Sequence, residues 1–344
     1  MRKLLFIFLF IPFLSSAQVD TTQKSLVNWM TIEKAEELNK TTQKPILIDI
    51  YTDWCSWCKY MIKTTYSNAN IAGFINNNFY PVQIDAETSD TLTFQGEKHT
   101  KVGKNNQLAV KLLSGRMSYP TTVFLSRDLK YSIPVPGYLK TTQIEPFLVY
   151  FSEDLYNSID AILFQQLYMM AYPKNFKEEL TKQPLGELID TLGSPKWLTF
   201  NEAFEKSKTE PKKYILFSHV NWRYSCKVME KTSFSNSVIT EELEKNYYLI
   251  SFDAATEETI SVNGKEYKSL GQGQPNELSM ELFQQQFYFP SVIVLDENFQ
   301  LLTVIRGFLT AEQLEPILSY FSSDTWKIVQ FEEYFKTFES KIKK

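Results

Sequence analysis

Two of the three cysteines in this 344-residue sequence lie in one short stretch, TDWCSWCK, as Cys55 and Cys58. The apolar segment PILIDIY (45–51) before them predicts a buried strand, and SWCKYMIKTTY after Cys55 has the spacing of a helix. A thiol at such a helix N-terminus is favoured as thiolate, because the unpaired N–H groups and partial positive charge stabilise an anion. Cys55 occupies this position, and Cys58 follows one turn later. Such a pair can exchange with an external disulfide, with one thiol attacking and the other resolving the mixed disulfide.

Two other interpretations of the pair have to be weighed. A C-x-x-C motif is also half of a zinc site, but zinc needs four ligands, and the sequence offers two histidines and one remote cysteine besides the pair. We therefore expect no metal, and nothing in the sequence indicates a cofactor. The second alternative is a non-enzymatic binding or assembly protein, in which a Cys55–Cys58 disulfide is only structural. Three cysteines are too few for a disulfide framework, which favours redox chemistry.

The start of the chain predicts a secretory signal peptide at residues 1–17. The basic start MRK precedes an apolar run at 4–14, and the small residues of SSA at 15–17 suit a cleavage site. The run is shorter than the roughly 20 residues that span a membrane. We therefore expect an exported protein, periplasmic or otherwise extracytoplasmic.

The composition is that of a folded chain, with 43% hydrophobic and 15% aromatic residues. The formal net charge of −4 gives no indication of a nucleic-acid or membrane-surface partner. The sequence does not indicate an oligomeric state.

The sequence repeats itself over a long period. Segment 27–59 recurs at 195–227 with a constant offset of 168 residues, so that Cys58 is matched by Cys226. At an offset of 170 residues, 118–125 matches 288–295, and 141–152 matches 311–322 with seven identities in twelve positions. A period this long indicates two tandem domains of one fold rather than a solenoid.

Within the first copy, strands and helices alternate, which predicts an α/β domain with a mixed central sheet flanked by helices. The expected strands are 45–51, 79–85, 121–126 and the proline-broken edge strand 130–138, and the expected helices include 106–113 and 141–152. Each copy is followed by a further helical pattern, which we expect to pack on its own domain. The predicted layout is a signal peptide (1–17), a first domain (25–153), a helical linker (154–193), a second domain (194–324) and a C-terminal helix (325–344).

The string ILIDIYTDWCSWCK resembles the active-site strand and helix of thioredoxin-fold proteins. TDWCSWCK is most similar to periplasmic thioredoxin-like reductases, including the C-terminal domain of the transmembrane disulfide-reductase family. The resemblance covers both repeats and implies tandem thioredoxin-like folds, the second degenerate. It implies a thiol–disulfide oxidoreductase, either a reductase or an isomerase, that acts on protein disulfides. A separate membrane-bound electron donor is implied too, since the sequence encodes no transmembrane relay.

The resemblance also implies roles for five further residues. Asp49 matches the buried acid that moves the proton of the second cysteine, a role that a raised pKa suits. Pro120 matches a cis-proline that faces the pair, which would leave the backbone of Tyr119 free to bind an extended substrate. Trp54 and Trp57 flank the first cysteine and are expected, with Tyr119, to contact the substrate.

The first copy departs from the resemblance in a long polar insertion. Residues 86–106 are more than the minimal fold needs, and His99 within them is expected to be a solvated loop residue. The residues between the cysteines, Ser56 and Trp57, differ from the Gly-Pro of cytosolic thioredoxins. These departures bear on the redox potential and the substrate.

The second copy lacks the chemistry of the first. Arg223 stands where the first copy has Cys55, and Phe217 stands where it has Asp49. A positive charge at a helix N-terminus is disfavoured, so we expect the long Arg223 side chain to reach into solvent. This domain is expected to be non-catalytic and to serve recognition or dimerisation.

The second copy retains a cysteine, Cys226, at the position of Cys58, and a proline, Pro290, at the position of Pro120. A single thiol at the inner position cannot complete a dithiol exchange. Three interpretations of Cys226 are open: a buried inert thiol, an intermolecular disulfide, or a bond to the first domain's pair during turnover.

Overall fold

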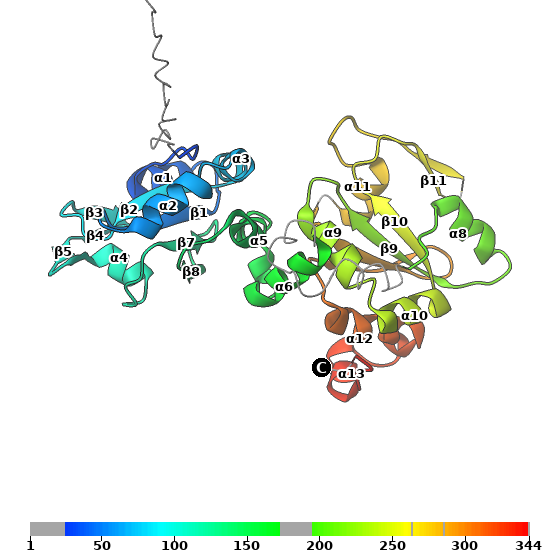
Figure 1. Ribbon diagram of the computed structural model, residues 1–344. Helices are drawn as coiled ribbons and strands as arrows, with labels where there is room; N and C mark the ends of the chain where they lie inside the picture. The colour runs from blue at the N-terminus through cyan, green and yellow to red at the C-terminus, as the bar shows by residue number, and fades with distance from the viewer. Residues whose placement is uncertain (1–24, 173–194, 263, 285, 343–344) are drawn as a thin grey trace, which may run out of the picture.

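The computed structural model describes residues 25–172, 195–262, 264–284 and 286–342. They form two α/β domains, each built on a four-stranded sheet flanked by helices (Figure 1). The α/β class with a mixed central sheet is therefore confirmed. The predicted signal peptide and the 173–193 part of the predicted linker lie outside the described residues.

The first domain begins with α1 (Ile32–Asn39) and ends with α5 (Thr141–Ser152). Its sheet has the order β2-β1-β7-β8, with β1 and β2 parallel and the other pairs antiparallel. The remaining elements are β1 (Ile46–Tyr51), α2 (Ser56–Thr64), α3 (Ala69–Asn78), β2 (Tyr80–Asp85), α4 (Gln107–Leu112), β7 (Thr121–Leu125) and β8 (Ser132–Pro136). The proline-containing β8 lies at the sheet edge, as expected.

The second domain repeats this arrangement with the sheet order β10-β9-β13-β14. Its elements are α8 (Phe200–Ser207), β9 (Lys213–His219), α9 (Tyr224–Thr232), α10 (Ser237–Asn246), β10 (Tyr247–Asp253), β11 (Ile260–Val262), β12 (Lys265–Tyr267), α11 (Glu277–Phe283), β13 (Ser291–Leu295), β14 (Leu301–Arg306) and α12 (Ala311–Ser322). Strand β9 corresponds to β1, and helix α9 to α2.

A short 3₁₀ turn and a helix follow each domain, in the same order. After α5 come η1 (Leu155–Asn157) and α6 (Ala161–Ala171); after α12 come η3 (Thr325–Lys327) and α13 (Phe331–Thr337). Figure 1 shows α5 and α6 between the two domains, with α6 beside α9. The helices predicted to follow each copy are therefore present.

The central strand of each sheet supplies the core beneath the cysteine-bearing helix. In β1 the side chains Ile46–Ile50 are all buried, and Asp49 is the one charged residue among them. Asp49 lies opposite Gln83 of β2 in the parallel register. A nearly buried carboxyl group is thus held by the sheet below α2.

The polar insertion, for which the sequence predicted no elements, forms two small hairpins. The strands are β3 (Leu92–Phe94), β4 (Glu97–His99), β5 (Lys101–Val102) and β6 (Asn105–Asn106). His99 is 8% exposed, and its Nε2 is 3.8 Å from Glu97 Oε2, so the expectation of a solvated histidine is wrong. The β-hairpin places alternate side chains on opposite faces, and His99 points inward.

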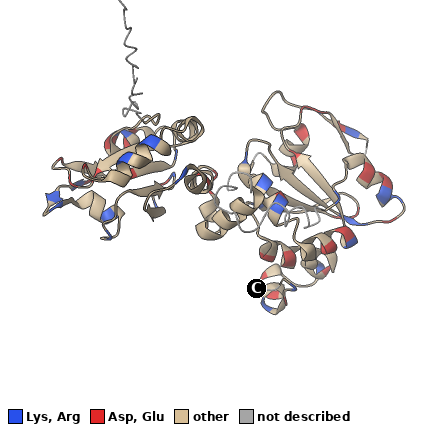
Figure 2. Ribbon diagram, in the orientation of Figure 1, with Lys and Arg blue, Asp and Glu red and all other residues tan. Residues whose placement is uncertain are grey.

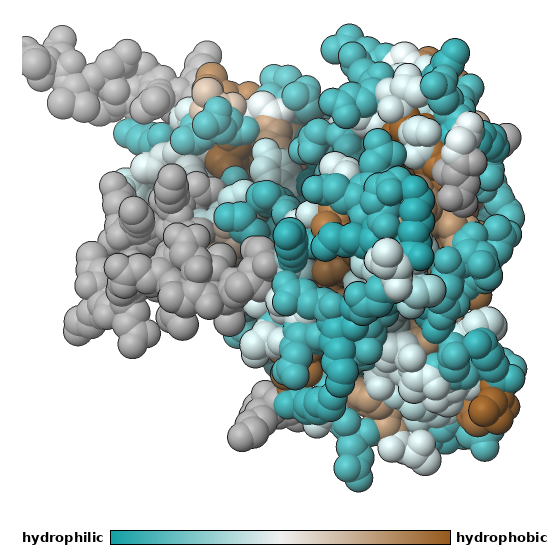
Figure 3. Space-filling view, turned by 90° about the vertical axis from the view of Figure 1, so that its right-hand side faces the viewer, coloured by the Kyte–Doolittle hydropathy of each residue, from teal (hydrophilic) through white to brown (hydrophobic). Residues whose placement is uncertain are grey.

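Acidic and basic residues are interspersed over both domains (Figure 2). The face seen in Figure 3 is largely hydrophilic, with small apolar spots. Among the described residues, no helix is long and apolar enough to cross a bilayer, and no three His, Cys, Asp or Glu side chains gather as a metal site.

Candidate active site

The cysteine pair lies where strand β1 gives way to helix α2, as the sequence predicts. Cys55 is the N-cap of α2, and its Sγ accepts a hydrogen bond from the Cys58 N–H at 3.1 Å. The two cysteines form a disulfide, and their side chains are 5% and 4% exposed. In the reduced state, the same N–H group and the helix dipole would stabilise a Cys55 thiolate.

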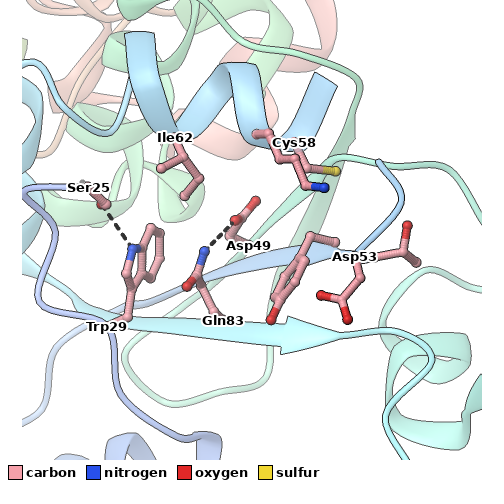
Figure 4. A pocket seen from close by; sticks show the side chains of 10 residues that line it. Ser25, Trp29, Asp49, Asp53, Cys58, Ile62 and Gln83 are labelled. Carbon is pink, nitrogen blue, oxygen red and sulfur yellow. Dashed lines mark hydrogen bonds between the residues drawn. The ribbon is translucent and has the colours of Figure 1, made fainter. Parts of the chain in front are cut away.

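Asp49 lies below the pair in a cavity of about 500 Å³ (Figure 4). The same cavity is lined by Cys58, Trp29 and Gln83. Gln83 Nε2 donates a hydrogen bond of 3.1 Å to Asp49 Oδ2, whereas Asp49 Oδ1 has no hydrogen-bond partner among the described residues. Burial raises the pKa of Asp49 to about 6, and the Gln83 bond opposes this shift. The carboxyl group can therefore take up and release a proton near neutral pH, close to the inner cysteine.

The loop before β7 carries the expected cis bond, between Tyr119 and Pro120. Tyr119 is held by a hydrogen bond from its hydroxyl to Asn105 Oδ1 at 3.2 Å, and its ring contacts the Trp54 ring edge-on at 5.9 Å. Trp54 is 67% exposed, and its Nε1 donates to Glu87 Oε1. Simple core packing of Trp54 is therefore excluded. Asn105 and Glu87 come from the insertion, and sequence reasoning assigned neither to the site.

An exposed aromatic cluster adjoins the disulfide on its other side. Trp57 is 59% exposed, and its ring lies 5.8 Å from Tyr60 and 5.7 Å from Tyr138. Tyr60 and Tyr138 were missed in the sequence. The helical spacing of Tyr60, three residues after Trp57, was a signal for it, but Tyr138 follows the edge strand β8 and only the fold brings it beside α2.

The matching position of the second domain has no thiol pair. Arg223 is the N-cap of α9, and its Nη1 donates a hydrogen bond of 3.1 Å to the Phe289 carbonyl oxygen. Phe289 precedes Pro290, and the bond between them is cis. The prediction that Arg223 reaches into solvent is wrong, because this nearby carbonyl group and the Tyr288 ring receive the guanidinium group. The carbonyl that precedes the cis-proline is thus already occupied.

A carboxylate from the first domain caps helix α9. Glu153, the residue after α5, accepts hydrogen bonds from the backbone N–H groups of Tyr224 at 2.8 Å and Ser225 at 3.1 Å, and from the Ser225 hydroxyl. Glu153 is 7% exposed, and burial raises its pKa. The N-terminus of α9 therefore holds an anion, as a helix N-terminus favours, but the anion belongs to the other domain.

Helix α6 covers the rest of this face. Its sequence, AILFQQLYMMA, has no charged residue, which Figure 2 shows as an uninterrupted tan helix. The Phe164 ring meets Phe308 of the second domain at 5.8 Å, and Val228 of α9 is fully buried. Phe164 also contacts Tyr150 of α5, at 5.9 Å. The prediction that this helix packs only on its own domain is wrong, because its apolar surface is wide enough to serve both domains.

Cys226 lies beneath this contact as a free, buried thiol. Burial raises its pKa to about 12, so it carries almost no thiolate at neutral pH. Of the three interpretations, the structure favours the inert thiol. Phe217, in place of the acid, packs against the rings of Trp197 and Phe234 and offers no proton acceptor.

Comparison with known protein families assigns both halves of the chain. Residues 13–145 match the family Thioredox_DsbH, described as "Protein of unknown function, DUF255", and residues 200–322 match the family Thioredoxin_2, described as a thioredoxin-like domain. The two matched regions both have thioredoxin-like folds. The duplication inferred from the sequence is therefore confirmed as two tandem thioredoxin-like domains, the first with a close cysteine pair.

Individual relatives match only in part. An uncharacterized protein of Caenorhabditis elegans is 29% identical over 105 residues, which is 30% of this chain and 13% of that protein. The thiol:disulfide interchange protein DsbD of Photorhabdus laumondii is 26% identical over 128 residues, which is 36% of this chain and 19% of that protein. The match thus spans less than a fifth of each curated relative. A solved DsbH oxidoreductase is 20% identical, with a TM-score of 0.27, over 37% of this chain and 84% of that one.

Proposed function

We propose that this chain is an exported thiol–disulfide oxidoreductase that acts on protein disulfides through Cys55 and Cys58. The observation that carries the proposal is the cysteine pair at the N-terminus of α2 above a buried acid whose pKa is raised to about 6. A purely structural disulfide has no need of a titratable carboxyl group in a cavity beside the inner sulfur.

The reaction follows from this geometry. The Cys55 thiolate attacks one sulfur of a substrate disulfide, and the other substrate sulfur leaves as a thiolate that takes up a proton. Cys58 then passes its proton to Asp49, and its thiolate attacks Cys55. This step releases the second substrate thiol and forms the Cys55–Cys58 disulfide. Two electrons pass from the pair to the substrate, so a separate reductant has to restore the dithiol, and we propose a membrane-bound donor.

The exposed side chains around the pair suit a protein substrate. Trp54, Trp57 and Tyr119 present apolar surface on both sides of nearly buried sulfurs. The backbone of Tyr119 beside the cis bond would pair with an extended segment of the substrate. We assign the direction to reduction or isomerisation rather than oxidation, on the sequence resemblance.

For the second domain we propose a non-catalytic role. Its counterpart of the redox face is occupied by Glu153 and α6, which follow the first domain. Recognition of a substrate at that face would require their displacement, so any recognition or dimerisation by this domain would use another surface.

An insulin-reduction assay and the reduction potential of the pair test the proposal together. We expect turnover that is lost in Cys55→Ser, and a Cys58→Ser variant that retains protein substrates as mixed disulfides. A potential well below about −300 mV without turnover would instead support the structural disulfide of a binding or assembly protein.

A further inference from the structure

The first domain has an exposed aromatic cluster beside its cysteine pair. The equivalent surface of the second domain is covered. Trp57, Tyr60 and Tyr138 are in mutual contact, with 5.2 Å between the Tyr60 and Tyr138 rings, and Tyr60 is 49% exposed. Their counterparts in the repeat are Ser225, Val228 and Phe308, and all three are fully buried, at 0% exposure.

The cover in the second domain is the segment that follows the first domain. Phe164 and Tyr168 of α6 are fully buried, and Ser158 lies so close to Gly307 that its Oγ would be 2.6 Å from an added Cβ. The corresponding Gly137 of the first domain has nothing within 4 Å of that position. The same surface is thus covered in the second domain and open in the first.

The segment that follows the second domain is built on the same plan. The Tyr320 hydroxyl donates to the Val329 carbonyl, as Tyr150 donates to Ile159 in the first domain. This contact places η3 and α13 on α12 as η1 and α6 lie on α5. None of the seven residues of α13 is buried, although they include Phe331, Tyr334 and Phe335.

Compared with α6, this segment has aromatic residues at the positions that contact the second domain and different residues at the exposed positions. In sequence, Tyr334 and Phe338 stand where α6 has the buried Phe164 and Tyr168, although Phe338 directly follows the last residue of α13. By contrast, acidic residues replace outward-facing apolar ones: Glu332 replaces Ile162, which is 65% exposed, and Glu333 replaces Leu163, which is 38% exposed. An aromatic stripe with a charged back is suited to bind an apolar surface.

Two further residues of this segment suit it to bind the first domain. Ile328, at the position of Ser158, is 86% exposed, the largest exposed fraction among the apolar side chains of the described residues. Ser323 stands at the position of Glu153, so a docked segment would bring no carboxylate against a Cys55 thiolate. In the second domain the carboxylate is tolerated because Arg223 replaces that cysteine.

We propose that residues 323–338 of one copy dock on the Trp57–Tyr60–Tyr138 face of a second copy, as the segment with α6 docks on the second domain. Each copy then has one donor segment and one acceptor face, so association is head-to-tail. The docked segment lies beside the cysteine pair and restricts access to it.

Sedimentation velocity of the purified full chain over a concentration series tests the proposal. We expect reversible association that Ile328→Asp weakens roughly tenfold or more, because an apolar side chain that becomes buried is replaced by a charge. Ile162→Asp is the matched control, since Ile162 is also a well-exposed isoleucine (65%, against 86% for Ile328) and lies on the outward face of α6, and it should leave association unchanged. Equal loss in both variants would show general apolar aggregation and overturn the proposal.

A second measurement locates the acceptor face. A synthetic peptide of residues 323–342, added in excess, should dissociate the assemblies and shield Trp57 from a fluorescence quencher. Tyr60→Glu should abolish both effects. A chain that stays monomeric at about 100 µM, or assemblies that the peptide and Tyr60→Glu leave intact, would overturn the proposal. Neither readout depends on turnover, so the result stands apart from that of the redox assays.

Discussion

The two domains start their second helix in the same way and stabilise its N-terminus with different groups. In the first domain the Cys55 sulfur is the N-cap of α2, and the groups around it leave an aromatic surface open. In the second domain Glu153 supplies a carboxylate to α9, and Arg223 occupies the carbonyl before the cis-proline. The difference shows that a site with one thiol missing can take on a structural role. The groups that favour a thiolate also favour a carboxylate, so the same site can hold two domains together.

An exchange of the two N-cap residues should have the largest effect. Cys55→Arg should abolish insulin reduction, because no attacking thiol remains. Arg223→Cys in the Cys55→Ser background should restore nothing, because Glu153 and α6 cover the new thiol and Phe217 supplies no proton acceptor. Turnover above background in that double variant would show that the covered face opens in solution.

The acid below the pair should be the next most sensitive position. Asp49→Asn should slow insulin reduction on the order of 100-fold, because the inner thiol loses its proton acceptor. The variant should also be more stable at pH 8, by roughly 2–3 kcal/mol.

The sign of this stability change follows from the pKa of Asp49. Folding raises this pKa from 3.8 to about 6, so the folded chain holds the proton more tightly than the unfolded chain. The free energy of unfolding therefore falls as the pH rises through this window, and asparagine removes the fall. Denaturant titrations at pH 4 and pH 8 measure it. Asp53→Asn, an exposed carboxylate that lines the same cavity, is the control, and an equal gain there would refute the assignment.

The interdomain cap should contribute to stability and not to chemistry. Glu153→Ala should lower the free energy of unfolding by about 2–3 kcal/mol, because it leaves the partly buried N–H group of Tyr224 and the buried N–H group of Ser225 without an acceptor. Ser323→Ala, the matching position after the second domain, should change it by less than about 0.5 kcal/mol. Guanidinium titration distinguishes the two. Similar values for both variants would mean that Glu153 does not tie the domains together.

The smallest effect should come from the exposed tryptophans. Trp54→Ala should raise KM for a protein disulfide severalfold and leave the free energy of unfolding nearly unchanged, because the side chain is 67% exposed. Trp222 is its counterpart, 58% exposed, and Trp222→Ala should alter neither quantity. Steady-state kinetics of the pair of variants would expose a substrate role of the second domain if Trp222→Ala also raised KM.

Much of this comparison could be predicted from the sequence, because it depends on local patterns. The strand before Cys55, the helix after it, the burial of Asp49 and the cis bond at Pro120 all follow from short motifs and the family resemblance. The assigned roles of these residues in catalysis and substrate binding stay predictions.

The contacts between distant segments could not be predicted. Glu153 reaches α9 across 71 residues of sequence, and no pattern in either segment marks the other. The contacts of α6 with both domains depend on how the domains are placed. Tyr138 lies beside Trp57 only because the folded sheet brings these distant residues together. His99 looked solvated because its neighbours are polar, but the hairpin buries its side chain while Glu97 and Lys98 stay exposed.

The Glu153 cap also affects how the chain can evolve. Replacement of Arg223 by cysteine alone would place a thiolate beside a buried carboxylate, and loss of Glu153 alone would leave the helix N-terminus without its anion. Each step towards a second working site is therefore unfavourable alone, and several changes would have to occur together. A second working site would need Arg223, Phe217 and Glu153 to change together.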